Sequence, residues 1–215
     1  MSILFATPCY GGMVTEAHFS SCLQLKDSLN AEGIDHNWYT LANESLVQRA
    51  RNNCVDFFLE ETDFEYLMFI DADIEFRPED VAKLYAMEVE IAVGVYRMKK
   101  PESMFAAWYH GELVTELDQF QAPIEVDYAG TGFMLIRRSV FSSLLATNLA
   151  GPNIEGYENS FGRNEYGFFM CPVEDGTLLS EDYFFCKRAR ERGISIWMDP
   201  SIRLTHYGSI GYGEK

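Results

Sequence analysis

Basic residues are scarce in this sequence. It holds 17 Lys and Arg against 33 Asp and Glu, which gives a formal net charge of −16. Nucleic acids and anionic membrane surfaces would repel such a chain, so neither is expected as a partner. Long apolar runs are missing as well. No segment approaches the roughly 20 apolar residues that a membrane-spanning helix needs, and no membrane span is expected.

Cysteine is too sparse and too scattered for a disulfide framework or a thiolate metal site. The chain has five cysteines without close metal-type spacing, Cys9, Cys22, Cys54, Cys171 and Cys186. The first residues also lack the basic segment of a secretory signal, and their short apolar run ends at Pro8, which predicts a first strand instead. Both features indicate a reducing, cytoplasmic compartment.

Apolar periodicity predicts alternating strands and helices in the first 100 residues. Strands are expected at 3–7, 36–41, 67–70 and 91–96, and helices at 15–30, from Ser45 and from Pro78. This alternation is typical of a mostly parallel sheet with helices on both faces. With 215 residues, 47% of them hydrophobic, the chain is long enough to bury a sizeable core, and one domain spanning residues 1–215 is expected.

The pattern changes beyond residue 100. Strands predicted at 111–117, 125–128 and 132–136 have fewer helices between them, so part of the sheet is expected to be antiparallel. The segment 151–176 combines Gly, Asn, acids and aromatics without periodicity, which is typical of a long loop that is either functional or disordered. A helix from Ser180, a strand at 194–198 and a tail with His206 follow. The predicted fold class is therefore α/β, with a mixed, mostly parallel central sheet flanked by helices.

The most informative motif is the apolar run Leu67–Ile70, which ends in Asp71-Ala72-Asp73. A buried unpaired carboxylate is costly, so acids at the tip of an apolar strand are expected in a crevice with water, a cation or a substrate. In open α/β sheets, ligands bind in that crevice. Two carboxylates one residue apart suit a divalent cation such as Mg²⁺, which keeps phosphate oxygens of its substrate as further ligands. The motif predicts a metal-bound phosphate ester.

Six segments, in this order and spacing, resemble the GT-A fold glycosyltransferases, particularly the family-2-like group and the small single-domain viral and bacterial enzymes. They are Thr7-Pro8-Cys9-Tyr10-Gly11, Ala50-Arg51-Asn52, Phe69-Ile70-Asp71-Ala72-Asp73, Ala129-Gly130-Thr131-Gly132-Phe133, Glu181-Asp182 and His206. The resemblance implies a single GT-A (Rossmann-like) domain. It also implies transfer of a sugar from a nucleotide-sugar donor to a hydroxyl of a glycan or other acceptor, and UDP is the commoner nucleotide in this group.

The resemblance assigns the metal and diphosphate to one motif. Asp71, Ala72 and Asp73 match the family's DXD motif, which holds Mn²⁺ or Mg²⁺ against the two phosphates of the donor, whereas the alternative is a solvated strand end. His206, after the last core strand, matches a metal-binding histidine. A surface histidine or a hydrogen-bonded core histidine is the alternative there, and neutral imidazole suits Mn²⁺ better than Mg²⁺.

Glu181 and Asp182 match the acid pair of inverting members, in which the aspartate deprotonates the acceptor hydroxyl as a general base. Acids in the first turn of a helix are also favoured by the helix dipole and need no other role. The pair therefore favours inversion but leaves retention open.

Nucleotide contacts are implied for the end of the first strand and for the second helix. Thr7, Pro8 and Tyr10 match the segment that cradles base and ribose, and the alternative is an ordinary strand-to-helix loop. Arg51 and Asn52 match residues that bind base or diphosphate, and the alternative is the polar face of their helix.

Two glycines complete the candidate residues, and two lysines are not among them. Gly130 and Gly132 match a turn under the donor sugar and acceptor, where a side chain would block approach, and an ordinary turn is the alternative. Lys99 and Lys100 are expected to be solvated.

Three other functions remain as alternatives. A metal-dependent phosphatase of the haloacid dehalogenase type also has a DxD after an apolar strand, but on the first strand and followed by Gly-Thr, where this chain has Ile74-Glu75. A nucleotide-sugar pyrophosphorylase would need a basic phosphate loop after the first strand, and Pro8 to Gly12 carry no Lys or Arg. The third is an inactive carbohydrate-binding domain of the same fold.

Overall fold

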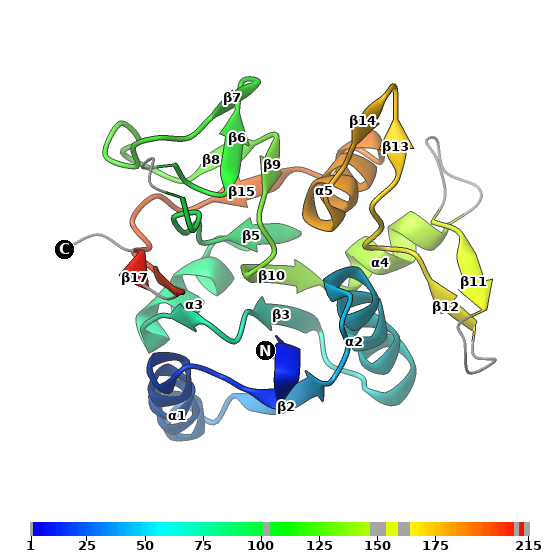
Figure 1. Cartoon of the computed structure of the whole chain (residues 1–215). Helices are drawn as coiled ribbons and strands as arrows, with labels where there is room; N and C mark the ends of the chain where they lie inside the picture. The colour runs from blue at the N-terminus through cyan, green and yellow to red at the C-terminus, as the bar shows by residue number, and fades with distance from the viewer. Residues whose placement is uncertain (1, 101–103, 147–153, 159–163, 209–210, 213–215) are drawn as a thin grey trace.

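The computed structural model describes residues 2–100, 104–146, 154–158, 164–208 and 211–212. Its largest sheet has seven strands in the order β2-β1-β3-β10-β5-β15-β8 (Figure 1). These are β1 (Ser2–Cys9), β2 (Asp35–Ala42), β3 (Tyr66–Ile70), β5 (Ile91–Val93), β8 (Ile124–Val126), β10 (Phe133–Arg137) and β15 (Ile196–Met198).

The sheet is mixed, and most of its strands share one direction. β1 is parallel to both β2 and β3. β10 is antiparallel to both β3 and β5, and β15 is parallel to β5. Five of the seven strands therefore run the same way, while β10 and β8 run against them. This arrangement confirms the predicted mixed, mostly parallel sheet with an antiparallel part.

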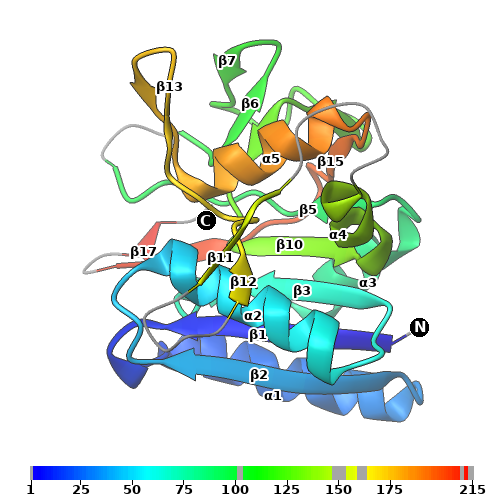
Figure 2. The same ribbon diagram turned by 90° about the vertical axis from the view of Figure 1, so that its right-hand side faces the viewer.

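Helices cover both faces of the sheet, as predicted (Figure 2). They are α1 (Glu16–Ala31), α2 (Val47–Glu61), α3 (Pro78–Ala86), α4 (Arg138–Leu145) and α5 (Glu181–Glu191). In β1, Leu4 and Ala6 pack with α2, α4 and α5, and Ile3 and Phe5 pack with α1 and α3. Because successive side chains of a strand point to opposite faces, one strand serves both cores. Every residue of β3 is buried for the same reason.

Smaller sheets and hairpins lie around this centre. They are formed by β4 (Ile74–Glu75), β16 (Thr205–Tyr207) and β17 (Gly211–Tyr212); by β6 (Ala107–Tyr109), β7 (Glu112–Leu113) and β9 (Tyr128–Ala129); by β11 (Gly156–Glu158) and β12 (Asn164–Tyr166); and by β13 (Val173–Glu174) and β14 (Thr177–Leu178). The expected strand at 111–117 is thus only the two residues of β7. The predicted loop 151–176 contains β11, β12 and β13, whereas β14 follows it, and 151–153 and 159–163 lie outside the described residues.

The first strand is longer than predicted. Pro8 was expected to end it, but β1 continues to Cys9 and is followed by a short 3-10 turn, η1 (Tyr10–Gly12). Beyond Ala6 the strand has a partner only in β2 among the described residues, because its pairing with β3 stops there. A proline, which lacks an N–H, is tolerated where one side of the strand is unpaired.

Two helix starts also differ from expectation. α2 begins at Val47 instead of Ser45, and its N-cap residue is Leu46, which provides no side-chain cap. The Glu44 carboxylate accepts the N–H of Leu46 at 3.0 Å. α4 was not predicted at all, because it follows β10 directly at Arg138 with no side-chain cap or turn residue to mark its start.

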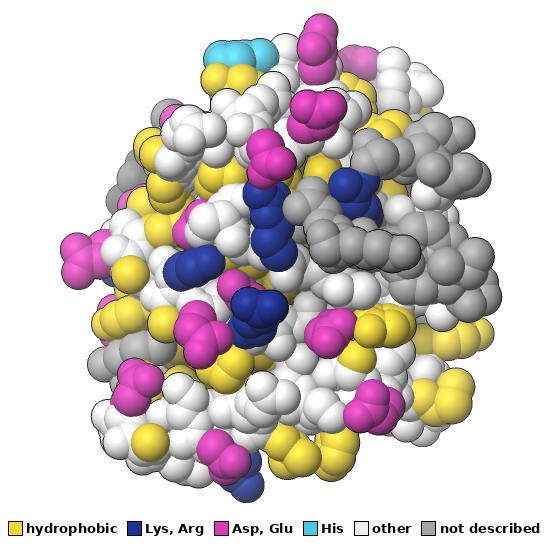
Figure 3. Space-filling model, turned by 90° about the vertical axis from the view of Figure 1, so that its left-hand side faces the viewer, with side chains coloured by type: hydrophobic (Ala, Val, Ile, Leu, Met, Phe, Trp, Pro, Cys, Tyr) yellow, Lys and Arg dark blue, Asp and Glu magenta, His cyan; other side chains and the backbone are white. Residues whose placement is uncertain are grey.

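Acidic and basic side chains are distributed differently over the surface. On the face seen in Figure 3, Asp and Glu side chains are spread widely, while Lys and Arg side chains gather near the centre. An anionic ligand is therefore not repelled equally by every part of the surface. Among the described helices, none has the length and apolar character needed to cross a membrane.

Candidate active site

The candidate residues meet at one edge of the large sheet. β1, β3 and β5 run in the same direction, so their carboxyl ends lie at this edge. β10 runs the other way, and its first residue, Phe133, pairs with Ile70 at the end of β3. The Asp71 N–H consequently donates to the Gly132 carbonyl at 2.9 Å. This is the edge at which open α/β sheets bind ligands.

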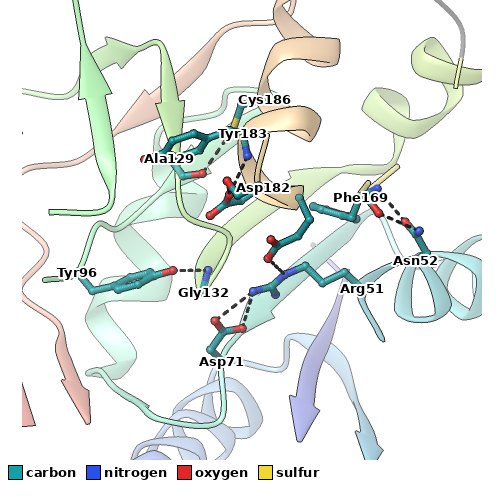
Figure 4. A network of polar contacts seen from close by, with 12 residues as sticks. Arg51, Asn52, Asp71, Tyr96, Ala129, Gly132, Phe169, Asp182, Tyr183 and Cys186 are labelled. Carbon is teal, nitrogen blue, oxygen red and sulfur yellow. Dashed lines mark hydrogen bonds and ion pairs between the residues drawn. The ribbon is translucent and has the colours of Figure 1, made fainter. Parts of the chain in front are cut away.

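Arg51 of α2 joins the two acid motifs (Figure 4). Its Nη2 lies 3.0 Å from Asp71 Oδ1, and its Nε lies 3.4 Å from Glu181 Oε1. The Arg51 side chain is only 4% exposed. Burial opposes the guanidinium charge, but the carboxylates of Asp71 and Glu181 outweigh it and raise the pKa of Arg51. Arg51 was expected to contact nucleotide, whereas here it holds together the end of β3 and the start of α5.

The Asp73 carboxylate faces His206 and Lys99, which belong to other segments of the chain. β16 pairs antiparallel with β4, with His206 opposite Ile74, and this places His206 Nε2 3.5 Å from Asp73 Oδ1. The Lys99 ammonium pairs with Asp73 Oδ2. Burial raises the pKa of Asp73, but His206 and Lys99 outweigh it and lower that pKa to about 2. Lys99, expected to be solvated, is thus a member of the site.

The fit of a metal ion depends on Asp73 and His206. Within the described part of the chain, no three or more His, Cys, Asp or Glu side chains are arranged to hold a metal ion. His206 Nδ1 lies 2.9 Å from the Arg97 carbonyl, and this contact orients the ring with Nε2 toward Asp73. A carboxylate oxygen and an imidazole nitrogen 3.5 Å apart can both bind one divalent cation, and such a donor pair suits Mn²⁺. The other expected ligand, Asp71, is engaged by Arg51.

The Asp182 carboxylate is held through one oxygen, and its pKa is raised. Its Oδ1 accepts from the Ser180 hydroxyl and, at 2.8 Å, from the Tyr183 N–H. Its Oδ2 accepts no hydrogen bond from the residues that the structure describes. Burial and the neighbouring Glu181 carboxylate raise the pKa of Asp182 to about 6. The group is therefore ionised at neutral pH and more basic than an ordinary aspartate.

The two predicted glycines are required by Tyr96, which the sequence did not reveal as a site residue. A Cβ at Gly130 would lie 2.5 Å from the Tyr96 hydroxyl oxygen, and one at Gly132 would lie 2.7 Å from it and 2.8 Å from Asp71 Oδ2. The Gly132 N–H donates to that hydroxyl at 3.1 Å. The turn is therefore kept free of side chains by a buried tyrosine, in addition to any role beneath a ligand.

A pocket of about 610 Å³ opens beside Asp71, Ala72 and Asp73. Pro8 and Tyr10, two of the expected nucleotide contacts, line it. Its other lining residues are Cys9, Met13, Val14, Thr15, Leu41, Glu44, Ser45, Val47 and Ala50. The wall is mostly apolar, and the acids Glu44, Asp71 and Asp73 also line it, so the pocket offers both an apolar surface and carboxylates to a ligand. Ala72 is held there by Thr15, whose N–H donates to its carbonyl at 2.9 Å.

Thr7 and Asn52 lie away from this pocket. Thr7 is 2% exposed within β1 and is not among the lining residues. Asn52 has no exposed surface, and both ends of its amide bond the Phe169 backbone, at 2.8 and 3.1 Å. Neither residue lines the pocket, and direct nucleotide contact by Thr7 or Asn52 stays a prediction. Asn52 fixes the segment after β12 against α2.

The structure adds Tyr96 and Lys99 to the site. It also leaves two buried polar atoms without a hydrogen-bond partner among the described residues. Both residues follow the carboxyl end of β5. The strand was predicted at 91–96, so Tyr96 stood at its predicted end and Lys99 shortly after it, and this position was the available signal. Arg51 Nη1 and Thr131 Oγ1 are buried and have no hydrogen-bond partner among the described residues. Since buried polar atoms are normally paired, they provide hydrogen-bonding capacity for a water molecule or a ligand.

No model of a known protein family matches this sequence, and no curated protein matches it. Protein A197 from STIV has a similar structure, with a TM-score of 0.59 and 20% identity over 97% of this chain and 86% of that chain. The two proteins share a fold. At such identity the likeness extends to the fold alone.

Two enzymes are similar at lower scores. The catalytic domain of Drosophila beta1,4galactosyltransferase 7 has a TM-score of 0.47 and 12% identity, over 94% of this chain and 66% of that chain. The inositol-1-phosphate CTP transferase from T. maritima also has a TM-score of 0.47, with 14% identity over 96% of this chain and 89% of that chain. These scores are too low to assign an activity.

Proposed function

We propose that this chain is a metal-dependent glycosyltransferase of the GT-A, family-2-like kind, which moves a sugar from a nucleotide-diphosphate sugar to a hydroxyl of a glycan or other acceptor. The observation that carries the proposal is the ion-pair bridge of Arg51. It unites an acid motif suited to the donor, at Asp71, with an acid pair suited to the acceptor, at Glu181. A reaction between two substrates needs both at one place.

The donor would bind along the pocket beside η1. Its flat base would lie against the apolar wall near Pro8 and Tyr10, and its diphosphate would lie at the end that carries Asp71 and Asp73. Asp73 and His206 would hold the divalent cation, Mn²⁺ or Mg²⁺. When bound, that cation stabilises the negative charge of the leaving nucleoside diphosphate. UDP is the proposed nucleotide, on the ground of the sequence resemblance.

Asp182 would take the proton of the acceptor hydroxyl as it attacks the anomeric carbon. Ser180 and the Tyr183 N–H hold Oδ1 and thereby fix the orientation of the carboxylate. Oδ2, which no described residue bonds, would accept the proton. A base that acts on an attacking hydroxyl implies direct displacement and inversion. Anomeric NMR of the first-formed product tests this: a product with the donor's anomeric configuration contradicts the assignment.

Thermal denaturation with nucleoside diphosphates, with and without Mn²⁺, tests the proposed function as a whole. The expected result is stabilisation by one nucleotide only when Mn²⁺ is present, because ligand and metal would bind the folded state together. Asp73→Asn should remove the joint effect, and Glu79→Gln, at an exposed position of α3, is the control. A phosphatase or an inactive carbohydrate-binding domain should show no joint dependence. Pyrophosphate-dependent formation of nucleoside triphosphate would indicate a pyrophosphorylase.

A further inference from the structure

Lys99 places a positive charge where the proposed function requires a divalent cation. Its ammonium pairs with Asp73 Oδ2, while His206 Nε2 faces Oδ1 of the same carboxylate. The Lys99 and Asp73 side chains are 36% and 32% exposed. An ion pair of a partly exposed lysine contributes little free energy, so the Lys99 ammonium can exchange Asp73 for another anionic partner.

The other cation of the site cannot move in this way. Arg51 is 4% exposed and is held by two carboxylates, those of Asp71 and Glu181. Lys99, in contrast, ends at one carboxylate in the part of the chain that the structure describes. The site therefore contains a buried positive charge, that of Arg51, which is held in place, and a partly exposed one, that of Lys99, which can move.

We propose that Lys99 is an internal counter-ion that competes with the divalent cation for Asp73 and, once displaced, binds the diphosphate of the donor. This inference rests on the proposed function and adds a residue to it. One carboxylate cannot fully serve an ammonium group and a divalent cation at short range, and the two cations repel each other. A displaced lysine remains tethered nearby, and an ammonium group is a good partner for phosphate oxygens.

Displacement of Lys99 makes cation and nucleotide binding cooperative. The cation frees Lys99 for the diphosphate, and the diphosphate, by drawing Lys99 away, frees Asp73 for the cation. Thermodynamic linkage requires the two effects to be equal. Lys99 therefore weakens the binding of Mn²⁺ alone and strengthens the binding of UDP once Mn²⁺ is present.

The test measures Mn²⁺ binding to the full chain without nucleotide, by electron paramagnetic resonance of the free ion, and then UDP binding at saturating Mn²⁺ by calorimetry. Lys99→Gln should bind Mn²⁺ about three- to tenfold more tightly than the parent and UDP correspondingly less tightly. Lys100→Gln removes the same charge one residue away and should change neither constant. Lys99→Arg keeps the charge and should behave like the parent.

The outcomes separate this inference from the proposed function. If Lys99→Gln binds Mn²⁺ no better than the parent while Asp73→Asn loses the ion, the role of Lys99 is wrong and the metal site stands. Equal tightening in Lys100→Gln would reduce the effect to general charge and would also overturn the inference. If Asp73→Asn binds Mn²⁺ as the parent does, the cation lies elsewhere, and both the proposed metal site and the role of Lys99 are wrong.

Discussion

Arg51 Nη2 lies 3.0 Å from Asp71 Oδ1, although one residue belongs to a helix and the other follows a strand. The arginine is almost fully buried, and the aspartate side chain is 26% exposed. The pair thus anchors an accessible carboxylate to a charge that the protein cannot move. A carboxylate fixed in this way presents its remaining surface to the pocket beside it.

Replacement of Arg51 should destabilise the protein and abolish activity together. Arg51→Met leaves Asp71 and Glu181 as neighbouring, partly buried acids without a counter-charge, a change that costs about 3 kcal/mol of the free energy of unfolding. Urea denaturation measures the loss. Arg49→Met is the matched control, because Arg49 pairs with Glu44 at the surface of the same helix and its loss should change stability little. Similar losses for both variants would contradict the role of the bridge.

The rate of sugar transfer should depend on the ionisation of Asp182. Its raised pKa of about 6 predicts that kcat/KM increases with pH through that value and levels off above it, because the base must be ionised. Asp182→Asn should lose most of the turnover and the remaining activity should lack this limb. A flat profile of the parent between pH 5 and 7 would exclude Asp182 as the base.

The raised pKa of Asp182 should also affect the stability of the fold. Its contribution to stability should fall as the pH rises, whereas the rate of transfer should increase. An unfolded aspartate loses its proton near pH 4, about two pH units below the folded group, so the folded state holds that proton more tightly. Its stabilising contribution is complete below about pH 4 and is lost as the pH rises through about 6. Above pH 6, Asp182→Asn should therefore be more stable than the parent, as urea denaturation at pH 4 and pH 7 would measure. A variant that is less stable at pH 7 would contradict this expectation.

Gly132 should not accept a side chain. The Cβ of Gly132→Ala would lie 2.7 Å from the Tyr96 hydroxyl oxygen, and overpacking of this kind costs about 1–3 kcal/mol. Tyr96→Ala removes that oxygen and also the ring carbon Cζ, which would lie 2.8 Å from the new Cβ, so the double variant should lose less stability than the sum of the single variants. Gly156→Ala, whose Cβ would meet nothing closer than 3.6 Å, is the control. Additive losses would show that Tyr96 is not the obstacle.

His206 should contribute to the affinity for Mn²⁺. His206→Ala removes the imidazole nitrogen that faces Asp73, and its Mn²⁺ affinity should fall at least about tenfold. His36→Ala is the control, because His36 also places Nδ1 by a backbone carbonyl, that of Ile34, but lies on β2. Calorimetric titration compares the two, and an unchanged affinity of His206→Ala would remove that residue from the metal site.

Much of the site's location could be predicted from local sequence. The acids after β3, the acid pair that begins α5 and the histidine after the last core strand were all identified, because each is marked by its position at the end of a regular element. The same role, contact with the nucleotide, was predicted for the neighbours Arg51 and Asn52. They lie next to each other on α2, yet one bonds Asp71 and the other bonds Phe169, since successive helix residues point about 100° apart and meet different segments.

The alternation of strands and helices, the apolar character of β3 and the acids at its end are properties of short stretches, so the sequence alone determined the fold class and the edge of the sheet that carries the candidate residues. Tertiary structure decided which charges meet. Arg51 and Glu181 are 130 residues apart, and Lys99 and Asp73 are 26 apart. Ion pairing depends on distance in space, and apolar periodicity carries no information on the separation of two polar atoms from different elements.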